Sequence, residues 1–225
     1  MARTRAQRQL VTTEEGTDSE WADLPEELKL KVLDREWTWR DSGAVRGTCR
    51  RWRAMHDADC KTLVVRNGVM DEVFHSLCGR LPALTSLDLS RLFQPNNEQP
   101  QSLTAEGLRA VGSLTALSFI DLCCCTNLTD AVLRELHGLT ALTHVNIGAC
   151  DKVTHVGLRE LGGLTALTWL NICDCPNVTD AGLRELHGLT ALTTLYLKTS
   201  PTTKAGRDAL KAAIPGLLTI DNRRV

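Results

Sequence analysis

The amino-acid sequence predicts an α/β solenoid, in which repeated strand–turn–helix units stack into a parallel inner sheet with outer helices. A small helical segment is expected before the solenoid. The first observation is a tetrapeptide, Leu-Thr-Ala-Leu, that begins at Leu114, Leu139, Leu164 and Leu189, always 25 residues apart. The second is that each copy is followed by alternating apolar residues and then by residues with helical spacing. One such unit cannot bury its apolar side alone, so neighbouring units must share a core.

Overall composition narrows the possible partners. The 225 residues suffice for one sizeable domain and a small one, and the net charge is −1. This charge gives no general attraction to nucleic acid or to a membrane surface. No apolar run reaches the roughly 18 residues that a membrane span needs. We therefore expect neither nucleic acid nor a membrane as partner.

The first residues carry Arg3, Arg5 and Arg8 but no apolar core, so they do not read as a secretory signal. An organelle transit peptide is a weaker alternative, because acidic residues begin at Glu14, and we expect a disordered tail over residues 1–20. Nine cysteines, an odd number, do not suggest the disulfide framework of a secreted protein. We expect reduced thiols and a cytoplasmic or nuclear location.

Residues 21–60 are expected to form a short helical domain. Asp23 and Pro25 favour the start of a helix, and Leu24, Leu28 and Val32 follow at four-residue spacing. A second helix would follow within the same segment. Taken alone, such a pair of helices could simply shield the end of the solenoid.

The same segment resembles an F-box. The resemblance is carried by Leu-Pro-Glu-Glu-Leu at residues 24–28, by Val32-Leu33, and by Cys-Arg-Arg-Trp-Arg at residues 49–53. Members of that family dock onto the Skp-type linker of cullin-based SCF ubiquitin ligases. The resemblance implies that five residues lie at or near the linker contact: Leu24, Pro25, Leu28, Val32 and Leu33. The chain departs from the family's pattern at three positions, Glu36, Ser42 and Thr48.

Each repeat in residues 61–225 reads Leu-x-x-Leu-x-x-Leu-x-Leu-x-x-Cys. In one copy these positions are Leu114, Leu117, Ile120, Leu122 and Cys125. Alternation around Ile120 and Leu122 indicates a strand with one buried face. Thr129 or Asp130 is placed to cap the helix that follows. Three glycines recur where the helices should stop: Gly138, Gly163 and Gly188.

The same pattern extends beyond the four regular copies. Leu63 and Val65 are expected to open the sheet and Ile220 to close it, which gives about seven strands. An upstream copy, Leu81-Pro82-Ala83-Leu84, fits if about eight residues within 91–101 are an insertion.

These units resemble the leucine-rich-repeat family in its cysteine-containing subtype. The resemblance implies that Cys125, Cys150 and Cys175 turn inward and bond to the backbone where each strand ends. A metal or redox site is the weaker alternative, because the spacing of Cys173 and Cys175 is not that of a zinc knuckle. The cysteine ladder is interrupted at its ends, by Leu92 and Ser200.

The residues between the leucines should face the open, concave side of the sheet in columns. One column holds Phe119, His144 and Trp169, and the next holds Asp121, Asn146, Asn171 and Tyr196. Large aromatic side chains beside hydrogen-bonding groups are typical of protein interfaces. The alternative is that the rings only cover one another across neighbouring strands.

We expect no enzyme site and no cofactor. Cys123 and His144 lie on neighbouring strands but in different columns, and no oxyanion loop is evident. Together with the F-box resemblance, the concave columns predict a substrate adaptor that joins a target protein to an SCF ligase through a Skp-type linker and cullin. The alternative is a scaffold or inhibitor that uses the repeats alone.

Overall fold

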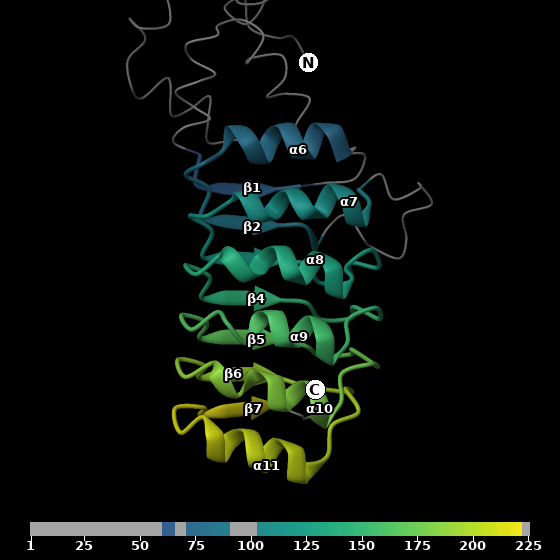
Figure 1. The fold of residues 1–225 in the computed structure, drawn as a ribbon, viewed down its shortest axis with the longest axis vertical. Helices are drawn as coiled ribbons and strands as arrows, with labels where there is room; N and C mark the ends of the chain where they lie inside the picture. The colour runs from purple at the N-terminus through teal and green to yellow at the C-terminus, as the bar shows by residue number, and fades with distance from the viewer. Residues whose placement is uncertain (1–59, 66–70, 91–102, 222–225) are drawn as a thin grey trace, which may run out of the picture. The chain divides into compact units, whose positions relative to one another are not determined.

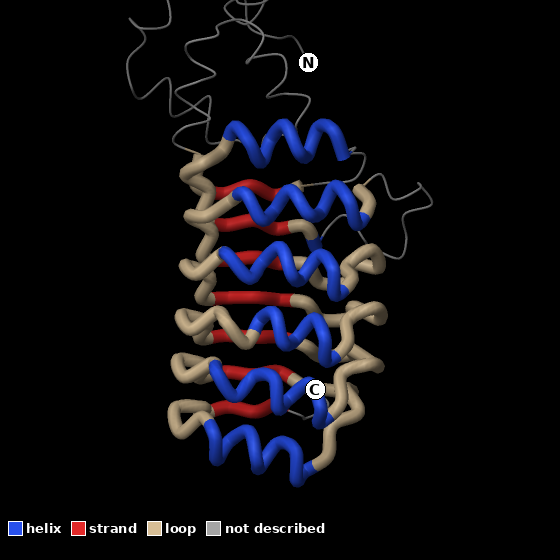
Figure 2. The backbone as a smooth tube through the Cα atoms, in the orientation of Figure 1, coloured by secondary structure: helices blue, strands red, loops and turns tan. Residues whose placement is uncertain are grey.

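The computed structural model describes residues 60–65, 71–90 and 103–221 of the chain. The predicted tail, residues 1–20, lies outside the described residues, and so does the F-box-like segment except for Cys60. The described residues form a two-layer stack in which the helices cover one face of a sheet (Figures 1 and 2).

The sheet has seven parallel strands that follow one another in sequence order. Each strand is three residues long, and they are β1 (Thr62–Val64), β2 (Ser86–Asp88), β3 (Phe119–Asp121), β4 (His144–Asn146), β5 (Trp169–Asn171), β6 (Thr194–Tyr196) and β7 (Thr219–Asp221). The predicted parallel sheet of about seven strands is therefore confirmed.

One helical segment connects each strand to the next. The α-helices are α6 (Asp71–Arg80), α7 (Ala105–Leu108), α8 (Asp130–Glu135), α9 (His155–Leu161), α10 (Asp180–Glu185) and α11 (Lys204–Ala213). Three of them continue into 3₁₀ turns: η2 (Arg109–Ser113), η3 (Leu136–Gly138) and η4 (Leu186–Gly188).

Strand register confirms the predicted insertion. Ser86 pairs with Phe119, 33 residues later, whereas Phe119 pairs with His144 after the regular 25. The eight additional residues therefore lie between β2 and β3, where residues 91–102 are outside the described part.

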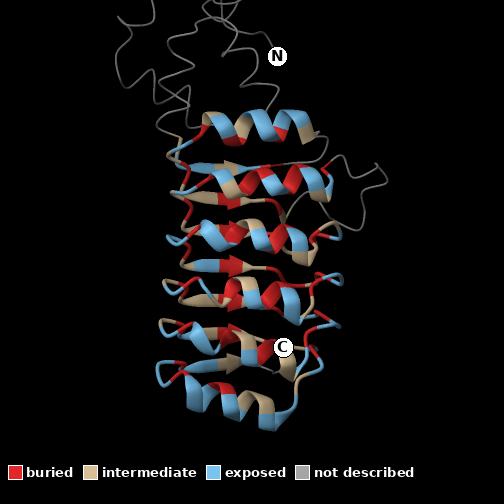
Figure 3. Ribbon diagram, in the orientation of Figure 1, coloured by how far each residue is buried: buried red, intermediate tan, exposed pale blue. Residues whose placement is uncertain are grey.

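The core lies between the two layers and runs without a break along the stack (Figure 3). The leucines that define the repeat are fully buried, among them Leu114, Leu117, Leu139 and Leu142. Burying one such side chain contributes about 1.5–3 kcal/mol. Because successive repeats contribute to the same cluster, each repeat is stabilised mainly by its neighbours.

The glycines expected to stop the helices do so without the left-handed backbone that helix-ending glycines often adopt. Gly138 and Gly188 close η3 and η4, yet neither has a positive φ. The left-handed residues instead follow the strands: Cys124, Ala149, Asp174 and Thr199, with φ between 54° and 66°. After strands β3 to β6 the sharp turn of the repeat therefore lies at a position that no glycine occupies.

The first residues of some helices bond to the start of the helix in the next repeat. This corrects the prediction that Thr129 or Asp130 caps its own helix. Thr129 occupies the cap position of α8, but its side chain makes no capping bond. The Asp130 carboxylate instead accepts bonds from the backbone N–H and the hydroxyl of Thr154, at 2.9 and 2.6 Å. Thr154 in turn caps its own helix, α9.

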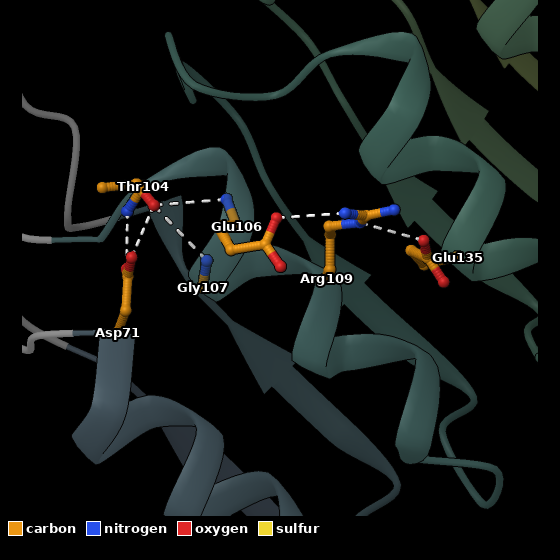
Figure 4. Close-up of polar contacts among 6 residues, drawn as sticks. All are labelled: Asp71, Thr104, Glu106, Gly107, Arg109 and Glu135. Carbon is orange, nitrogen blue, oxygen red and sulfur yellow. Dashed lines mark hydrogen bonds and ion pairs between the residues drawn. The ribbon is translucent and has the colours of Figure 1, made fainter.

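The same arrangement recurs at Asp71 with Thr104 (Figure 4). It recurs again at Asp180 with Thr203. Thr104 also caps α7 through the N–H groups of Glu106 and Gly107. These aspartate–threonine bonds therefore link α6 with α7, α8 with α9 and α10 with α11, which is a period of two repeats.

Candidate functional site

The central feature of the concave face is a row of four aromatic rings across strands β3 to β6. Register places Phe119, His144 and Trp169 side by side. Their ring centroids are 6.3 Å apart for Phe119–His144 and 6.2 Å for His144–Trp169. Tyr196, from the neighbouring column, lies 5.5 Å from Trp169 and completes the row. We call these four residues the aromatic row.

The exposure of the aromatic row bears on whether its rings form a binding surface or only cover one another. His144 is exposed, and Phe119, Trp169 and Tyr196 are half-buried. The rings therefore contact one another and remain partly accessible to solvent. Tyr196 was expected in the polar column, and its large ring reaches the row diagonally across the sheet.

The polar side chains of the column beside the aromatic row bond to the backbone just after each strand. Asp121, Asn146 and Asn171 each accept a bond from the backbone N–H two residues later, at 2.9, 3.1 and 3.0 Å. The Asn146 amide also donates to Asp121 at 3.0 Å, and the Asn171 amide donates to Asn146 at 2.9 Å. These predicted target-binding residues already have internal hydrogen bonds, so the aromatic row is the better candidate for contact with a partner.

A second ladder, which the sequence reasoning missed, runs along the residues just before the strands. The hydroxyls of Ser118, Thr143, Thr168 and Thr193 each donate to the carbonyl of the equivalent residue one repeat earlier, at 3.0–3.1 Å. The recurrence of a serine or threonine directly after each Leu-Thr-Ala-Leu tetrapeptide could have indicated it. This ladder ties adjacent strands together and fixes the spacing of the rings.

The inward cysteines behave as the family resemblance implies. The Cys150 thiol donates to the carbonyl of Leu122 and the Cys175 thiol to that of Ile147, both at 3.3 Å. Ser200 was expected to break this ladder, but its hydroxyl donates to the carbonyl of Ile172 at 2.7 Å. The smaller hydroxyl thus makes the equivalent bond. Leu92 lies outside the described residues.

Burial disfavours the ionised form of these thiols. It is the main reason that the pKa of Cys125 is raised to about 12 and that of Cys175 to about 11. The Cys123 sulfur lies 3.5 Å from the Cys124 sulfur. Desolvation is the main reason that the pKa of Cys123 is raised to about 12, and the contact with Cys124 is the second. A nucleophilic thiol needs a lowered pKa instead.

The described ranges contain no group of three or more side chains arranged to hold a metal ion. No helix within them is long and apolar enough to cross a membrane. The predicted linker-binding residues lie outside these ranges: Leu24, Pro25, Leu28, Val32 and Leu33.

Comparison with known proteins supports the fold. TLR13, in a complex with ssRNA13, is similar over 67% of this chain and 21% of its own, with 22% identity and a TM-score of 0.51. An internalin from Listeria monocytogenes covers 66% of this chain and 44% of its own, with 19% identity and a TM-score of 0.43. This chain therefore spans less than half the length of either protein.

No family model and no curated protein matches the sequence. The assignment of fold therefore depends on the seven-stranded parallel sheet, its outer helices and the likeness to TLR13. The described part of the chain is a leucine-rich-repeat solenoid.

Proposed function

We propose that this chain is a non-catalytic adaptor of an SCF-type cullin ubiquitin ligase. In this proposal the concave face binds a target protein, and residues 21–60 bind the Skp-type linker. The target is thereby delivered for ubiquitin-dependent degradation by the ligase, in the cytoplasm or nucleus.

The observation that supports target binding most strongly is the aromatic row, whose rings are partly open to solvent. The chain has nine Phe, Trp and Tyr residues, and three of them lie in this row with His144. Aromatic side chains on a rigid surface lose little entropy on binding and dominate the energy of many interfaces. The hydroxyl and amide ladders on either side hold the strands that carry the rings in fixed register.

Support for the ligase link comes from the sequence resemblance to an F-box. Its test is direct binding between the full chain and a purified Skp-type linker. We expect micromolar or tighter binding that Leu28→Asp with Val32→Asp abolishes, because two carboxylates would enter an apolar interface. Trp169→Ala is the matched control and should bind the linker normally. A wild-type chain that does not bind the linker would refute the ligase role.

Target binding is tested by affinity purification with the proteasome inhibited. Proteins that depend on the concave face should be lost with Phe119→Ala or Trp169→Ala. Val156→Ala is the matched control, because Val156 is an exposed apolar residue on helix α9. An identical set of partners from all three variants would contradict the proposal for this face.

The second candidate is a scaffold or inhibitor that uses the repeats alone. It predicts that deletion of residues 1–60 leaves target binding and cellular function intact. The adaptor proposal predicts that target binding survives this deletion but target degradation stops.

A further inference from the structure

Two carboxylates lie together on strands β2 and β3 of the concave face. Asp88 and Asp121 are register partners on β2 and β3, so two carboxylates lie directly opposite each other. The equivalent residues of the next two strands are neutral, Asn146 and Asn171. Lys198 follows β6 at the far end of the aromatic row, two residues after Tyr196. The face is therefore acidic where β2 meets β3 and uncharged along β4 and β5, whereas Lys198 shares its end of the face with Asp221, the register partner of Tyr196.

The two carboxylates are not neutralised within the described residues, because none of the ion pairs there involves Asp88 or Asp121. Asp88 accepts from the backbone N–H and the hydroxyl of Ser90, and Asp121 accepts from the backbone N–H of Cys123 and the amide of Asn146. These donors are neutral, so the bonds leave the negative charge in place. Like charges directly opposite each other on adjacent strands destabilise a sheet. A cation from a partner would relieve this repulsion.

The dimensions of the face fit an extended peptide that crosses the strands. Strands β2 and β6 are four strand spacings apart, about 19 Å. Seven extended residues span about 20 Å, and their alternate side chains are about 6.8 Å apart. This spacing is close to the 5.5–6.3 Å between neighbouring rings of the aromatic row.

Given the proposed target-binding role of this face, we propose that it takes an extended peptide segment of about seven residues with a basic residue at one end. The basic side chain lies between Asp88 and Asp121, where it also reaches the Phe119 ring. Apolar side chains of the peptide lie against the aromatic row. The acidic end disfavours phosphate groups, so a single-stranded nucleic acid is a poorer fit than this peptide.

The test is selection from a heptapeptide library with the full chain, followed by affinity measurements on labelled peptides. We expect selection of Arg or Lys at one position and of apolar residues two and four positions on. The double variant Asp88→Asn with Asp121→Asn should lose about tenfold in affinity for these peptides. Replacing their basic residue by Gln should then have little further effect.

The Asp→Asn substitutions preserve the fold, because asparagine already makes the equivalent strand-ending bonds at Asn146 and Asn171. Asp151→Asn is the matched control, since Asp151 is exposed on a turn outside the concave columns, and it should bind as wild type does. Unchanged affinity in the double variant would overturn the charge assignment.

Two further outcomes separate this inference from the proposed function. Peptides that depend on Trp169 but show no charge preference would overturn the inference and leave target binding standing. A labelled oligouridylate that binds more tightly than every peptide, and loses binding with Trp169→Ala, would overturn both. Absence of any bound peptide would overturn the inference, while target binding would remain testable by affinity purification.

Discussion

Gly157 on helix α9 is the position where the paired-repeat arrangement can be tested most sharply. A Cβ placed there would contact the Asp130 carboxylate and lie 2.7 Å from a methyl group of Leu133. Accommodating it requires Asp130 to move away from Thr154, to which it makes two hydrogen bonds. The equivalent residue of helix α8 is Val132, and α8 follows a helix that begins with Ala105 rather than with an aspartate.

The magnitude follows from two opposing effects. An alanine in place of glycine inside a helix contributes about 1 kcal/mol to stability. Overpacking and weakened bonds to a charged acceptor together cost about 3 kcal/mol. We therefore expect Gly157→Ala to lower the free energy of unfolding by about 2 kcal/mol.

The assay is urea unfolding followed by far-UV circular dichroism. Gly79→Ala on helix α6 is the matched control, because a Cβ there meets nothing within 4 Å, and it should be neutral or stabilising. In an Asp130→Ala background the cost of Gly157→Ala should shrink by at least about 1 kcal/mol. If Gly157→Ala stabilises the chain as Gly79→Ala does, the account of paired repeats is wrong.

Three further predictions concern the turns, the carboxylates and the thiols. Ala149→Gly should stabilise the chain by about 0.5–1 kcal/mol in urea unfolding, because Ala149 has a φ of 57°; a loss of stability would contradict this. Hydrogen bonds from Thr203 hold the pKa of Asp180 below its ordinary value of 3.8. The stability that these bonds contribute is present at a pH above 3.8 and is lost as the pH falls through the lowered pKa of Asp180 in the folded chain. The free energy of unfolding of Asp180→Asn should therefore fall less on acidification than that of the wild type. Cys125 and Cys175 should resist iodoacetamide in the native chain at neutral pH, as mass spectrometry would show, and react only on unfolding.

The repeat period was sufficient to predict the register of the concave columns. Because equivalent residues recur every 25 positions, Phe119, His144 and Trp169 had to be neighbours in a parallel sheet, and the structure places them so. The inward bonding of Cys150 and Cys175 was likewise implied by the family resemblance and is found.

Features that depend on the path of a single side chain could not be predicted in this way. From the sequence, the Asp130 side chain could either cap its own helix or bond to a residue of the next repeat. It bonds to Thr154 because the adjacent helix lies close enough, and this distance cannot be read from the sequence. Tyr196 joins the aromatic row because its ring is long enough to cross to Trp169. Asn146 and Asn171 could face a partner or bond to each other, and hydrogen bonds to the backbone two residues on fix their orientation.

Target binding on the aromatic row is the central proposal, and site-specific photo-crosslinking tests it most directly. A benzophenone amino acid would replace Phe119 in one full-length chain and Arg159, an exposed residue of helix α9, in another. In cells with the proteasome inhibited, we expect residue 119 to crosslink to the target protein and residue 159 to give no crosslink to it. Crosslinking of the same protein through residue 159 and not through residue 119 would place the binding surface on the helices and contradict the account.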